Sequence, residues 1–383
     1  MRLVYLSNIF HHLQKPLSDE LFVLTNGEYV FVETDAMKSG MAYKGEKAPY
    51  VMPYLNENKD QIKQMVFDSD VVLYGEAPMN LVKRRLRAGK LTFRDDERRY
   101  KKVNRYLKWP IYTYNSLLLN KGYLLCASAF ASRDYFYSGM SLKKCFKWGY
   151  FPAVREYEDL NGLLKNKRSF TDETIQIFWT GRLIELKHPE STLFVGRHLK
   201  QKGIKFEMII VGDGPLKDKL ERDVLSLDLV NEVQLLGLQP PEVVRTLMET
   251  SDIYLFTSDR GEGWGAVLNE SMNSACAVVA SPSSGSAPFL ITENKNGLFF
   301  KNKNWNDLSE KVEWLVNHPE ERIRLGREAY NTMVHVWSPQ VAANNLMKLV
   351  HSIQNGTDSG IVKGPCSPAQ YLPNNWRCFM KGV

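Results

Sequence analysis

The stretch DIYLFTSDRGEGWGAVLNE, residues 252–270, joins a short apolar run to a glycine-rich loop and the start of an amphipathic segment. The β-branched and aromatic residues of the run predict a buried strand over 252–256. The apolar spacing after the loop predicts a helix over 264–274. The three glycines of the loop allow positive φ angles and let a ligand approach the backbone closely. A strand, a loop and a helix in this order are typical of a parallel sheet covered by helices.

The same alternation continues along the whole chain. Nine further strands are predicted, over 2–7, 29–33, 70–74, 122–127, 174–180, 206–211, 232–236, 277–281 and 297–300. Helical patterns lie between them, for example over 189–202, 215–228, 241–250, 306–317 and 339–353. The fold class expected is therefore α/β, with two doubly wound, Rossmann-like parallel-sheet domains on either side of the polar segment 158–174. The expected boundaries are 1–165 for the first domain, 166–353 for the second and 354–383 for a tail that either packs back on the first domain or frays.

The composition places the chain among soluble globular proteins. Its 383 residues are too many for one ordinary core, and 44% are hydrophobic and 24% charged. We find no apolar run of about 18 residues, and the opening MRLVYLSNIF is better explained as a buried strand than as a secretory signal. Five cysteines without a CxxC spacing indicate neither a disulfide framework nor a zinc site. These features predict a cytoplasmic protein.

Positive charge is concentrated near the middle of the first domain. The net charge is +7, and residues 83–108 alone contain 12 basic and 3 acidic side chains. Two interpretations stay open: a solvated helical face, or a basic surface for anionic lipid head groups or a phosphate-bearing acceptor. The second would put the protein at the inner face of a membrane. Nucleic acid is disfavoured as a partner because no binding motif accompanies the charge.

Polar side chains follow several of the predicted strands, where ligands bind in doubly wound sheets. Arg182 and Lys187 lie in TGRLIELKHPE (180–190), and a guanidinium with an ammonium there suits a diphosphate. Glu262 and Glu270 are separated by seven residues, which would span about 12 Å if the stretch were all helical. Each pair also has a plainer explanation, namely two surface cations, and a helix-terminal acid followed by a surface glutamate.

Other motifs restrict the chemistry. The sequence contains no GxxxxGK[ST] loop, complete GxGxxG, GxSxG elbow or HExxH. DSD at 68–70 precedes a predicted strand instead of following one, so neither it nor DDE at 95–97 is interpreted as a metal site. His11 and His12 are the only histidines before position 188. An imidazole from the first domain must therefore come from one of these two, unless both serve capping or packing.

Five motifs occur together in a specific order: GRLIELK, VGDGP, LLGLQPPEVV, EGWGAVLNE and ENKNGLFF. In this order and spacing the chain resembles family 4 of the retaining glycosyltransferases over about 174–352. The amino-terminal half resembles bacterial polysaccharide-assembly transferases. The resemblance implies the GT-B fold, with two domains facing a central cleft. It also implies hexosyl transfer from a UDP- or GDP-sugar to a glycan or lipid-linked acceptor, in capsule or exopolysaccharide synthesis, without a metal or other cofactor.

The resemblance also implies roles for individual residues. Arg182 and Lys187 would hold the diphosphate, Glu262 the sugar hydroxyls and Glu270 the ribose, and attack would occur from the front face with retention. The expected catalytic residues are Glu262, Arg182, Lys187 and His12. The expected donor-binding residues are Gly181, Arg182, Lys187, Asp213, Leu238, Gln239, Glu262, Gly263, Trp264, Gly265, Val267 and Glu270. The expected acceptor-side residues are Asn8, His11, His12, Arg94 and Glu97.

Two departures from the family pattern stand out. His188 replaces a glycine, and SPSSGSAPFL (281–290) replaces a loop that normally carries a glutamate. Two other functions stay open at this point. One is an epimerase acting on nucleotide sugars, which would consume donor without acceptor. The other is a nucleotide-binding protein without transfer activity.

Overall fold

The computed structural model describes residues 1–35, 46–98, 118–171 and 174–373, and the chain divides into two compact units. Unit 1 comprises Met1–Ala153 and Val336–Val383, and unit 2 comprises Val154–His335. The sequence-based boundaries at 165/166 and 353/354 lie elsewhere. Residues from Val154 onward belong to unit 2, before the expected boundary, because the backbone amides of Arg155 and Tyr157 donate to Asn273 Oδ1 (2.8 Å) and to the Tyr330 hydroxyl (2.9 Å).

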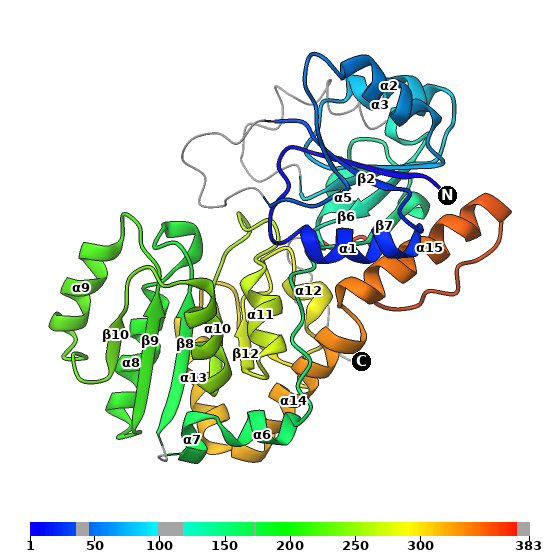
Figure 1. Ribbon diagram of the computed structural model, residues 1–383. Coiled ribbons are helices and arrows are strands. Elements are labelled where there is room, and N and C mark those ends of the chain that lie inside the picture. Colours follow the sequence, from blue (N-terminus) through cyan, green and yellow to red (C-terminus); the bar gives the residue numbers. More distant parts are fainter. Residues whose placement is uncertain (36–45, 99–117, 172–173, 374–383) are drawn as a thin grey trace. The chain divides into compact units, whose positions relative to one another are not determined.

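Unit 1 contains a seven-stranded, wholly parallel sheet with the order β3-β2-β1-β4-β5-β6-β7 (Figure 1). The interior strand β1 is buried at all five positions, as expected for a strand covered on both faces. The strands are β1 Leu3–Ser7, β2 Tyr29–Glu33, β3 Val51–Pro53, β4 Val71–Tyr74, β5 Thr92–Asp96, β6 Tyr123–Cys126 and β7 Cys145–Lys147.

Unit 2 contains a six-stranded parallel sheet with the order β10-β9-β8-β11-β12-β13. Apolar side chains from its strands and helices form one core, which includes Trp179 and Phe300. The strands are β8 Ile175–Thr180, β9 Phe206–Val211, β10 Val233–Leu235, β11 Ile253–Phe256, β12 Ala277–Ala280 and β13 Leu298–Phe299. All ten strands expected from the sequence are present, and both sheets have the predicted doubly wound, parallel form.

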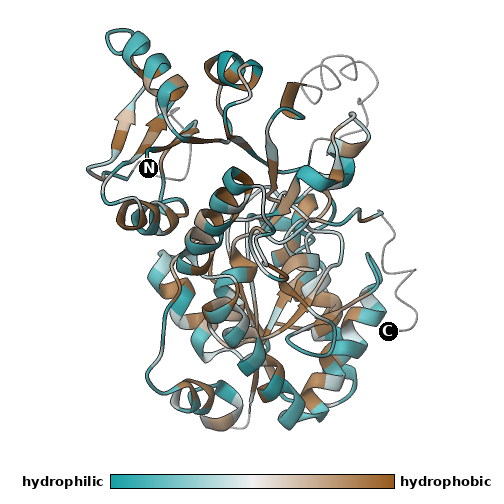
Figure 2. Cartoon of the chain, turned by 90° about the vertical axis from the view of Figure 1, so that its right-hand side faces the viewer, coloured by the Kyte–Doolittle hydropathy of each residue, from teal (hydrophilic) through white to brown (hydrophobic). Residues whose placement is uncertain are grey.

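Helices cover both faces of each sheet. In unit 1, α1 and α15 pack together, and α2 packs with α3; in unit 2, α8 packs with α13, and α10 with α11 (Figure 1). Many helices are hydrophilic on one side and hydrophobic on the other, as covering helices should be (Figure 2). In the described ranges no helix is long and apolar enough to cross a membrane.

The α-helices of unit 1 are α1 Lys15–Leu24, α2 Lys59–Asp68, α3 Asn80–Arg87, α5 Ala131–Phe136 and α15 Pro339–Asn355. Those of unit 2 are α6 Leu160–Lys165, α7 Arg168–Thr171, α8 Ser191–Gln201, α9 Lys217–Ser226, α10 Pro241–Thr250, α11 Val267–Asn273, α12 Ala287–Leu290, α13 Trp305–Asn317 and α14 Pro319–His335. Short 3₁₀ turns occupy Leu142–Lys144 and Glu185–Lys187.

The carboxyl-terminal segment packs against β7, the edge strand of unit 1. The amide of Cys366 donates to Lys147 O (2.7 Å), Lys147 N donates to Ser367 O (2.8 Å), and Ala369 N donates to Cys145 O (2.9 Å). An antiparallel bridge joins Phe146 and Pro368 within the same segment. The described part of the tail therefore lies on unit 1 and covers an otherwise open sheet edge.

Candidate functional site

The first candidate site lies where the direction of winding reverses in the sheet of unit 2. The chain runs from β8 outward through β9 and β10 and then returns to β11 on the other side of β8. Ligands of doubly wound sheets bind beyond the carboxyl ends of the strands at this point. Arg182 and Lys187 follow β8, Asp213 follows β9, and Glu262 follows β11. The topology thus brings these four expected donor-binding residues to one edge of the sheet.

Hydrogen bonds fasten the loop after β11 to the loop after β8. The Thr257 hydroxyl donates to Lys187 O (2.6 Å) and accepts from the Trp179 indole N–H (2.9 Å), and Asp259 N donates to Leu186 O (3.0 Å). Across this seam Lys187 Nζ forms an ion pair with Glu262 Oε2. Their side chains are only 15% and 14% exposed. The plainer explanation of Lys187 as an ordinary surface cation is therefore wrong.

The VGDGP turn fits closely against the loop after β8. Leu183 N donates to Asp213 O (2.8 Å), and Gly181 N donates to Val211 O (3.0 Å). Gly212 has a φ of 142°, and a β-carbon there would overlap the carbonyl oxygen of Gly181. Its glycine is required by this contact between two loops. The Asp213 carboxylate caps the amide of the next residue, while Arg182 is exposed.

The glycine-rich hairpin contributes backbone to the site, and its aromatic side chain belongs to the core. Trp264 is 1% exposed and donates its indole N–H to Asn269 Oδ1 (2.9 Å). Gly263 is buried, and Gly265 has a φ of 88° and a position where a β-carbon would overlap the Phe256 ring. The helix begins at Val267 and not at Trp264. The eight-residue separation of the two glutamates is therefore not wholly helical.

Glu270 lies on α11 in largely buried surroundings, so the plainer explanation of a surface glutamate is wrong. Burial raises the pKa of its carboxyl group above the usual value, and the positive charges of Arg245 and Arg155 oppose this rise. Arg245 is held close by, since its guanidinium donates to Glu270 O (2.9 Å). A carboxylate placed this way can accept hydrogen bonds from a ligand's hydroxyl groups.

The loop after β10 presents an apolar side chain to solvent. Leu238 is 76% exposed, and the Gln239 side chain donates to Leu236 O (2.7 Å). The loop is fixed to the VGDGP turn because Gly212 N donates to Gly237 O (2.9 Å). An exposed leucine on an anchored loop offers a surface for a flat ring.

Both departures from the family pattern have a structural counterpart. His188 adopts a left-handed φ of 51°, a conformation that glycine adopts easily, and its ring nitrogens lie 3.0 Å from Glu190 Oε1 and 3.5 Å from Asp259 Oδ2. In the loop after β12, the hydroxyls of Ser284 and Ser286 are buried, and the described part of the chain offers them no hydrogen-bond partner. Sequence reasoning noted the missing glutamate of this loop but not these hydroxyls.

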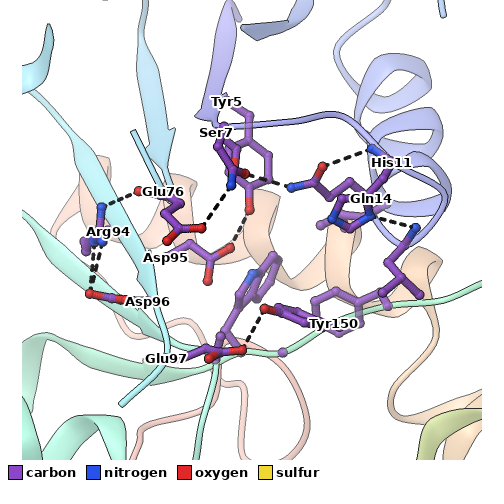
Figure 3. Close-up of a pocket in the computed structure, with 18 of the residues that line it drawn as sticks. Tyr5, Ser7, His11, Gln14, Glu76, Arg94, Asp95, Asp96, Glu97 and Tyr150 are labelled. Carbon is purple, nitrogen blue, oxygen red and sulfur yellow. Dashed lines mark hydrogen bonds and ion pairs between the residues drawn. The ribbon is translucent and has the colours of Figure 1, made fainter. Parts of the chain in front are cut away.

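The second candidate site is a pocket of about 410 Å³ in unit 1, at the carboxyl ends of β1, β4, β5 and β7 (Figure 3). Asn8, His11, Arg94 and Glu97 line it, so four expected acceptor-side residues meet in one cavity. His12 is exposed and does not line it; the two imidazole rings lie 5.9 Å apart. Burial, followed by the charge of His12, lowers the pKa of His11 to about 4, and burial lowers the pKa of His12. Both imidazoles are therefore neutral at pH 7.

The arginines of β5 and of the turn after it are engaged in ion pairs within unit 1. Arg94 forms an ion pair with Asp96 (3.1 Å), and its guanidinium lies 4.8 Å from the centre of the Tyr74 ring. Figure 3 shows Arg94 turned towards Asp96 and away from the middle of the pocket. Arg98 is 5% exposed and pairs with Asp134 (3.7 Å).

Three carboxylates of the pocket are held by uncharged donors. The Tyr5 hydroxyl donates to Asp95, Tyr150 donates to Glu97 (2.7 Å), and Asn8 donates to Glu76 (3.0 Å) (Figure 3). Burial raises the pKa of Asp95 to about 7. The Tyr5 hydrogen bond and the charge of Arg94 oppose the rise, and the neighbouring charges of Asp96 and Glu97 add to it. The carboxyl group of Asp95 can thus be either charged or neutral near pH 7.

Sequence reasoning missed Tyr5, Glu76, Asp95 and Tyr150. The available signal was DDE at 95–97, which was considered only as a metal-binding pattern. No group of three or more histidine, cysteine, aspartate or glutamate side chains in the described residues is arranged to hold a metal ion.

Neither interpretation of 83–108, a solvated helical face or a basic binding surface, fits several of its arginines. Arg85 is 1% exposed and bonds to backbone carbonyls, while Arg94 and Arg98 are engaged in ion pairs. A long aliphatic stem with a planar fork of donors suits such internal roles. The part of this stretch after Arg98 lies outside the described residues.

Comparisons with known proteins give a consistent result. The family described as "Glycosyl transferases group 1" matches residues 163–332. The chain is 33% identical over 135 residues to the amylovoran biosynthesis glycosyltransferase AmsK of Erwinia amylovora, an alignment covering 34% of this chain and 33% of that protein. It is 32% identical over 162 residues to a Campylobacter jejuni α-1,4-N-acetyl-D-galactosaminyltransferase, which covers 42% and 44% of the two chains.

The alignments with curated relatives span between 30% and 51% of those proteins. Among solved structures, Anabaena Alr3699/HepE in complex with UDP superposes with a TM-score of 0.69 at 13% identity, covering 92% of this chain and all of the other. At this identity the likeness concerns the fold alone.

Proposed function

We propose that the chain is a glycosyltransferase, because residues 163–332 match the glycosyl transferases group 1 family and the fold is that of solved GT-B glycosyltransferases. It moves a hexosyl group from a nucleotide diphosphate sugar to a glycan or lipid-linked acceptor in bacterial cell-surface polysaccharide synthesis. The name of AmsK refers to amylovoran biosynthesis, and that of the Campylobacter relative to a saccharide carried on PP-undecaprenol. Solved structures of HepE contain UDP and UDP-glucose, which supports a UDP-sugar as the donor.

The ion pair of Lys187 with Glu262 carries the proposal for the donor site. Departure of a nucleoside diphosphate builds negative charge on its β-phosphate. A preorganised ammonium and the neighbouring guanidinium of Arg182 stabilise that charge without a metal ion. Glu262, on the adjoining loop, accepts hydrogen bonds from the transferred sugar and orients it. Attack from the same face, with the departing phosphate taking the acceptor proton, gives retention.

The remaining donor contacts follow the same edge of the sheet. Glu270 accepts hydrogen bonds from the ribose hydroxyls, and exposed Leu238 covers one face of the base. Backbone from Gly181, Asp213, Gln239, Gly263, Trp264, Gly265 and Val267 completes the proposed donor site. The buried hydroxyls of Ser284 and Ser286 supply further groups at the neighbouring strand end.

The acceptor is bound by the pocket of unit 1 in this proposal. Asn8, His11 and Glu97 line it, and Arg94 fixes the acidic end of β5. His11 and exposed His12 act as neutral imidazoles, which can donate through one nitrogen and accept through the other. The four cysteines within the described ranges are buried and unbridged, which fits a reaction in the cytoplasm. Contact of 83–108 with an anionic membrane loses support from the internal roles of Arg85, Arg94 and Arg98.

A thermal-shift and product experiment tests the proposal. UDP, GDP and a panel of their sugars are added to the wild type, to Lys187→Met and Arg182→Ala, and to the matched surface variants Lys219→Met and Arg222→Ala. One nucleotide should raise the melting temperature of the wild type and of both surface variants, and do so less in the two site variants. No stabilisation by any nucleotide, or equal stabilisation in all variants, would overturn the donor site.

The chemistry is then followed with the donor that stabilises most, in the presence of a chelator and a bacterial glycolipid extract. Transfer with an unchanged anomeric configuration and without metal is expected. Conversion of the donor to its epimer without acceptor would indicate the epimerase instead. Glu262→Gln should lower the transfer rate by at least about a hundredfold, the loss typical of a group that acts in the transition state.

A further inference from the structure

The pocket of unit 1 has unused hydrogen-bond acceptors and no unengaged cation among its arginines. Asp95 Oδ2 accepts from Tyr5 and Glu76 Oε2 accepts from Asn8, both from uncharged donors. Within the described residues, the second oxygen of each carboxylate has no partner. Because an ionised carboxylate can accept about four hydrogen bonds, these two groups retain most of their capacity.

Among the described residues, the acidic side chains that line the pocket outnumber the arginines. Arg94 forms an ion pair with Asp96, and Arg98 shares Asp134 with Arg133, so the ion pairs of these arginines are made with other acids than Glu76 and Asp95. Glu76 and Asp95 have no ion pair among the described residues. Figure 3 shows the carboxylates of Glu76 and Asp95 close together on one side of the cavity, opposite His11. An anionic group placed there would face carboxylates at short range in a partly buried setting, where repulsion is poorly screened.

The shape of the pocket is suited to one small polar molecule. Its volume of about 410 Å³ falls in the range of small-molecule sites. Leu13 and the ring of Tyr150 line it together with the acids, so that it offers apolar surface as well as acceptors. A sugar ring has both characters, because hydroxyl groups lie around its edge and C–H groups on its faces.

We propose, resting on the function proposed above, that this pocket binds a non-anionic sugar of the acceptor. The sugar donates hydroxyl or ammonium hydrogens to Glu76 and Asp95, and a ring bearing phosphate or carboxylate is excluded. The acceptor residue that receives the hexose is therefore a neutral or amino sugar. Any phosphate of a lipid-linked acceptor lies outside this pocket.

The pH dependence of binding, through the ionisation of Asp95, distinguishes an amino sugar from a neutral sugar in this pocket. A bound ammonium favours the charged carboxylate of Asp95 and releases the carboxyl proton, so an amino sugar that carries its ammonium charge should bind more tightly as pH rises from 5 to 7. Above this range the amino group of the sugar loses its own proton, and the gain in affinity should disappear. A neutral sugar should show less change. The titratable groups around Asp95 are Tyr5 on β1, His11 after β1, Glu76 after β4, Arg94, Asp96 and Glu97 on or directly after β5, Cys126 on β6 and Tyr150 after β7.

The test measures binding of simple sugars to the full chain by ligand-observed NMR, with UDP present at saturation. The probes are the methyl glycosides of glucose and galactose, glucosamine and galactosamine, and glucose and galactose 6-phosphates. At least one non-anionic probe should bind ten times more tightly than its 6-phosphate. Asp95→Asn and Glu76→Gln should each weaken it at least fivefold, while the exposed Glu57→Gln of unit 1 should leave it unchanged.

Equal or tighter binding of the 6-phosphates would overturn the proposal. So would binding of none of the probes, or equal binding in all variants. Stabilisation by UDP, and its reduction in Lys187→Met, reports on unit 2 separately. Loss of the UDP effect with sugar selectivity retained would refute the proposed donor site and leave the pocket standing, and the converse result would do the opposite.

Discussion

Arg85 provides a stringent test of how the basic stretch 83–108 is interpreted, because its charged side chain is buried inside unit 1 and donates hydrogen bonds there. The side chain is 1% exposed, and burial lowers its pKa to about 10, so it is still charged at neutral pH. Its guanidinium joins the end of α2, the segment leading into β4, and the segment leading into β5. The acceptors are the carbonyl oxygens of Val66, Phe67, Ser69, Asp70 and Leu91 and the hydroxyl of Thr92.

Arg85→Met keeps the length of the side chain and removes every one of these hydrogen bonds. Truncating one member of a buried charged network costs about 3–5 kcal/mol, since the groups left behind stay desolvated. For a unit of this size that is a fall in melting temperature of about 6–20 °C. Arg85→Lys should recover only a part, because an ammonium has three donors and no planar fork.

Urea and thermal unfolding of the full chain provide the measurement, with the unit 1 transition followed at pH 7. The matched control is Arg87→Met, which removes an exposed arginine from the same helix and should change the free energy of unfolding by less than about 0.5 kcal/mol. If Arg85→Met unfolds within 1 kcal/mol of this control, the internal role of the arginine is refuted.

Three further predictions concern the two sites. Gly212→Ala should abolish stabilisation by UDP in a thermal-shift assay, because its β-carbon would overlap Gly181. The control is Gly203→Ala, whose β-carbon meets no other atom and which should lower the free energy of unfolding by only about 1 kcal/mol. Equal effects of the two substitutions would contradict the contact between the loops. The pKa of Asp95 is raised to about 7 in the folded protein, so the unfolded chain loses this proton at a lower pH. The free energy of unfolding of the wild type, measured by urea titration, should therefore fall between pH 5 and 8 more steeply than that of Asp95→Asn. Parallel curves for the two proteins would refute this. Leu238→Ser should weaken UDP several-fold in calorimetry without changing the melting temperature, and unchanged affinity would remove the leucine from the base site.

Much of the fold could be predicted because most strands are short apolar runs. β5 is the informative exception, since Thr92–Asp96 ends in three consecutive charged residues. Those charges are tolerated because Arg94 pairs with Asp96 and Tyr5 donates to Asp95. The first partnership lies within β5 and the second comes from β1, and neither produces an alternation of apolar and polar residues along β5 that would predict a strand. The acidic lining of the pocket, formed by Glu76 and Asp95, could not be predicted from the sequence for the same reason.

The candidate donor site was predictable to the level of motifs. Their order and spacing point to Lys187 and Glu262, but these residues are far apart in sequence. Their pairing depends on the seam between two loops, in which Thr257 bonds to Lys187 O. In unit 1, the adjacent residues His11 and His12 cannot be told apart by their sequence context. Only the turn before α1 decides that His11 lines the pocket.

The discontinuity of unit 1 has a consequence for biosynthesis. α1 buries Leu17 and Leu21, and its packing partner α15 leaves the ribosome some three hundred residues later. Val154–His335 forms a continuous unit, so it can fold as soon as it has been translated. The apolar face of α1 therefore stays exposed until α15 has been translated. A premature stop codon just after His335 would therefore leave the nascent product prone to aggregation and to capture by chaperones.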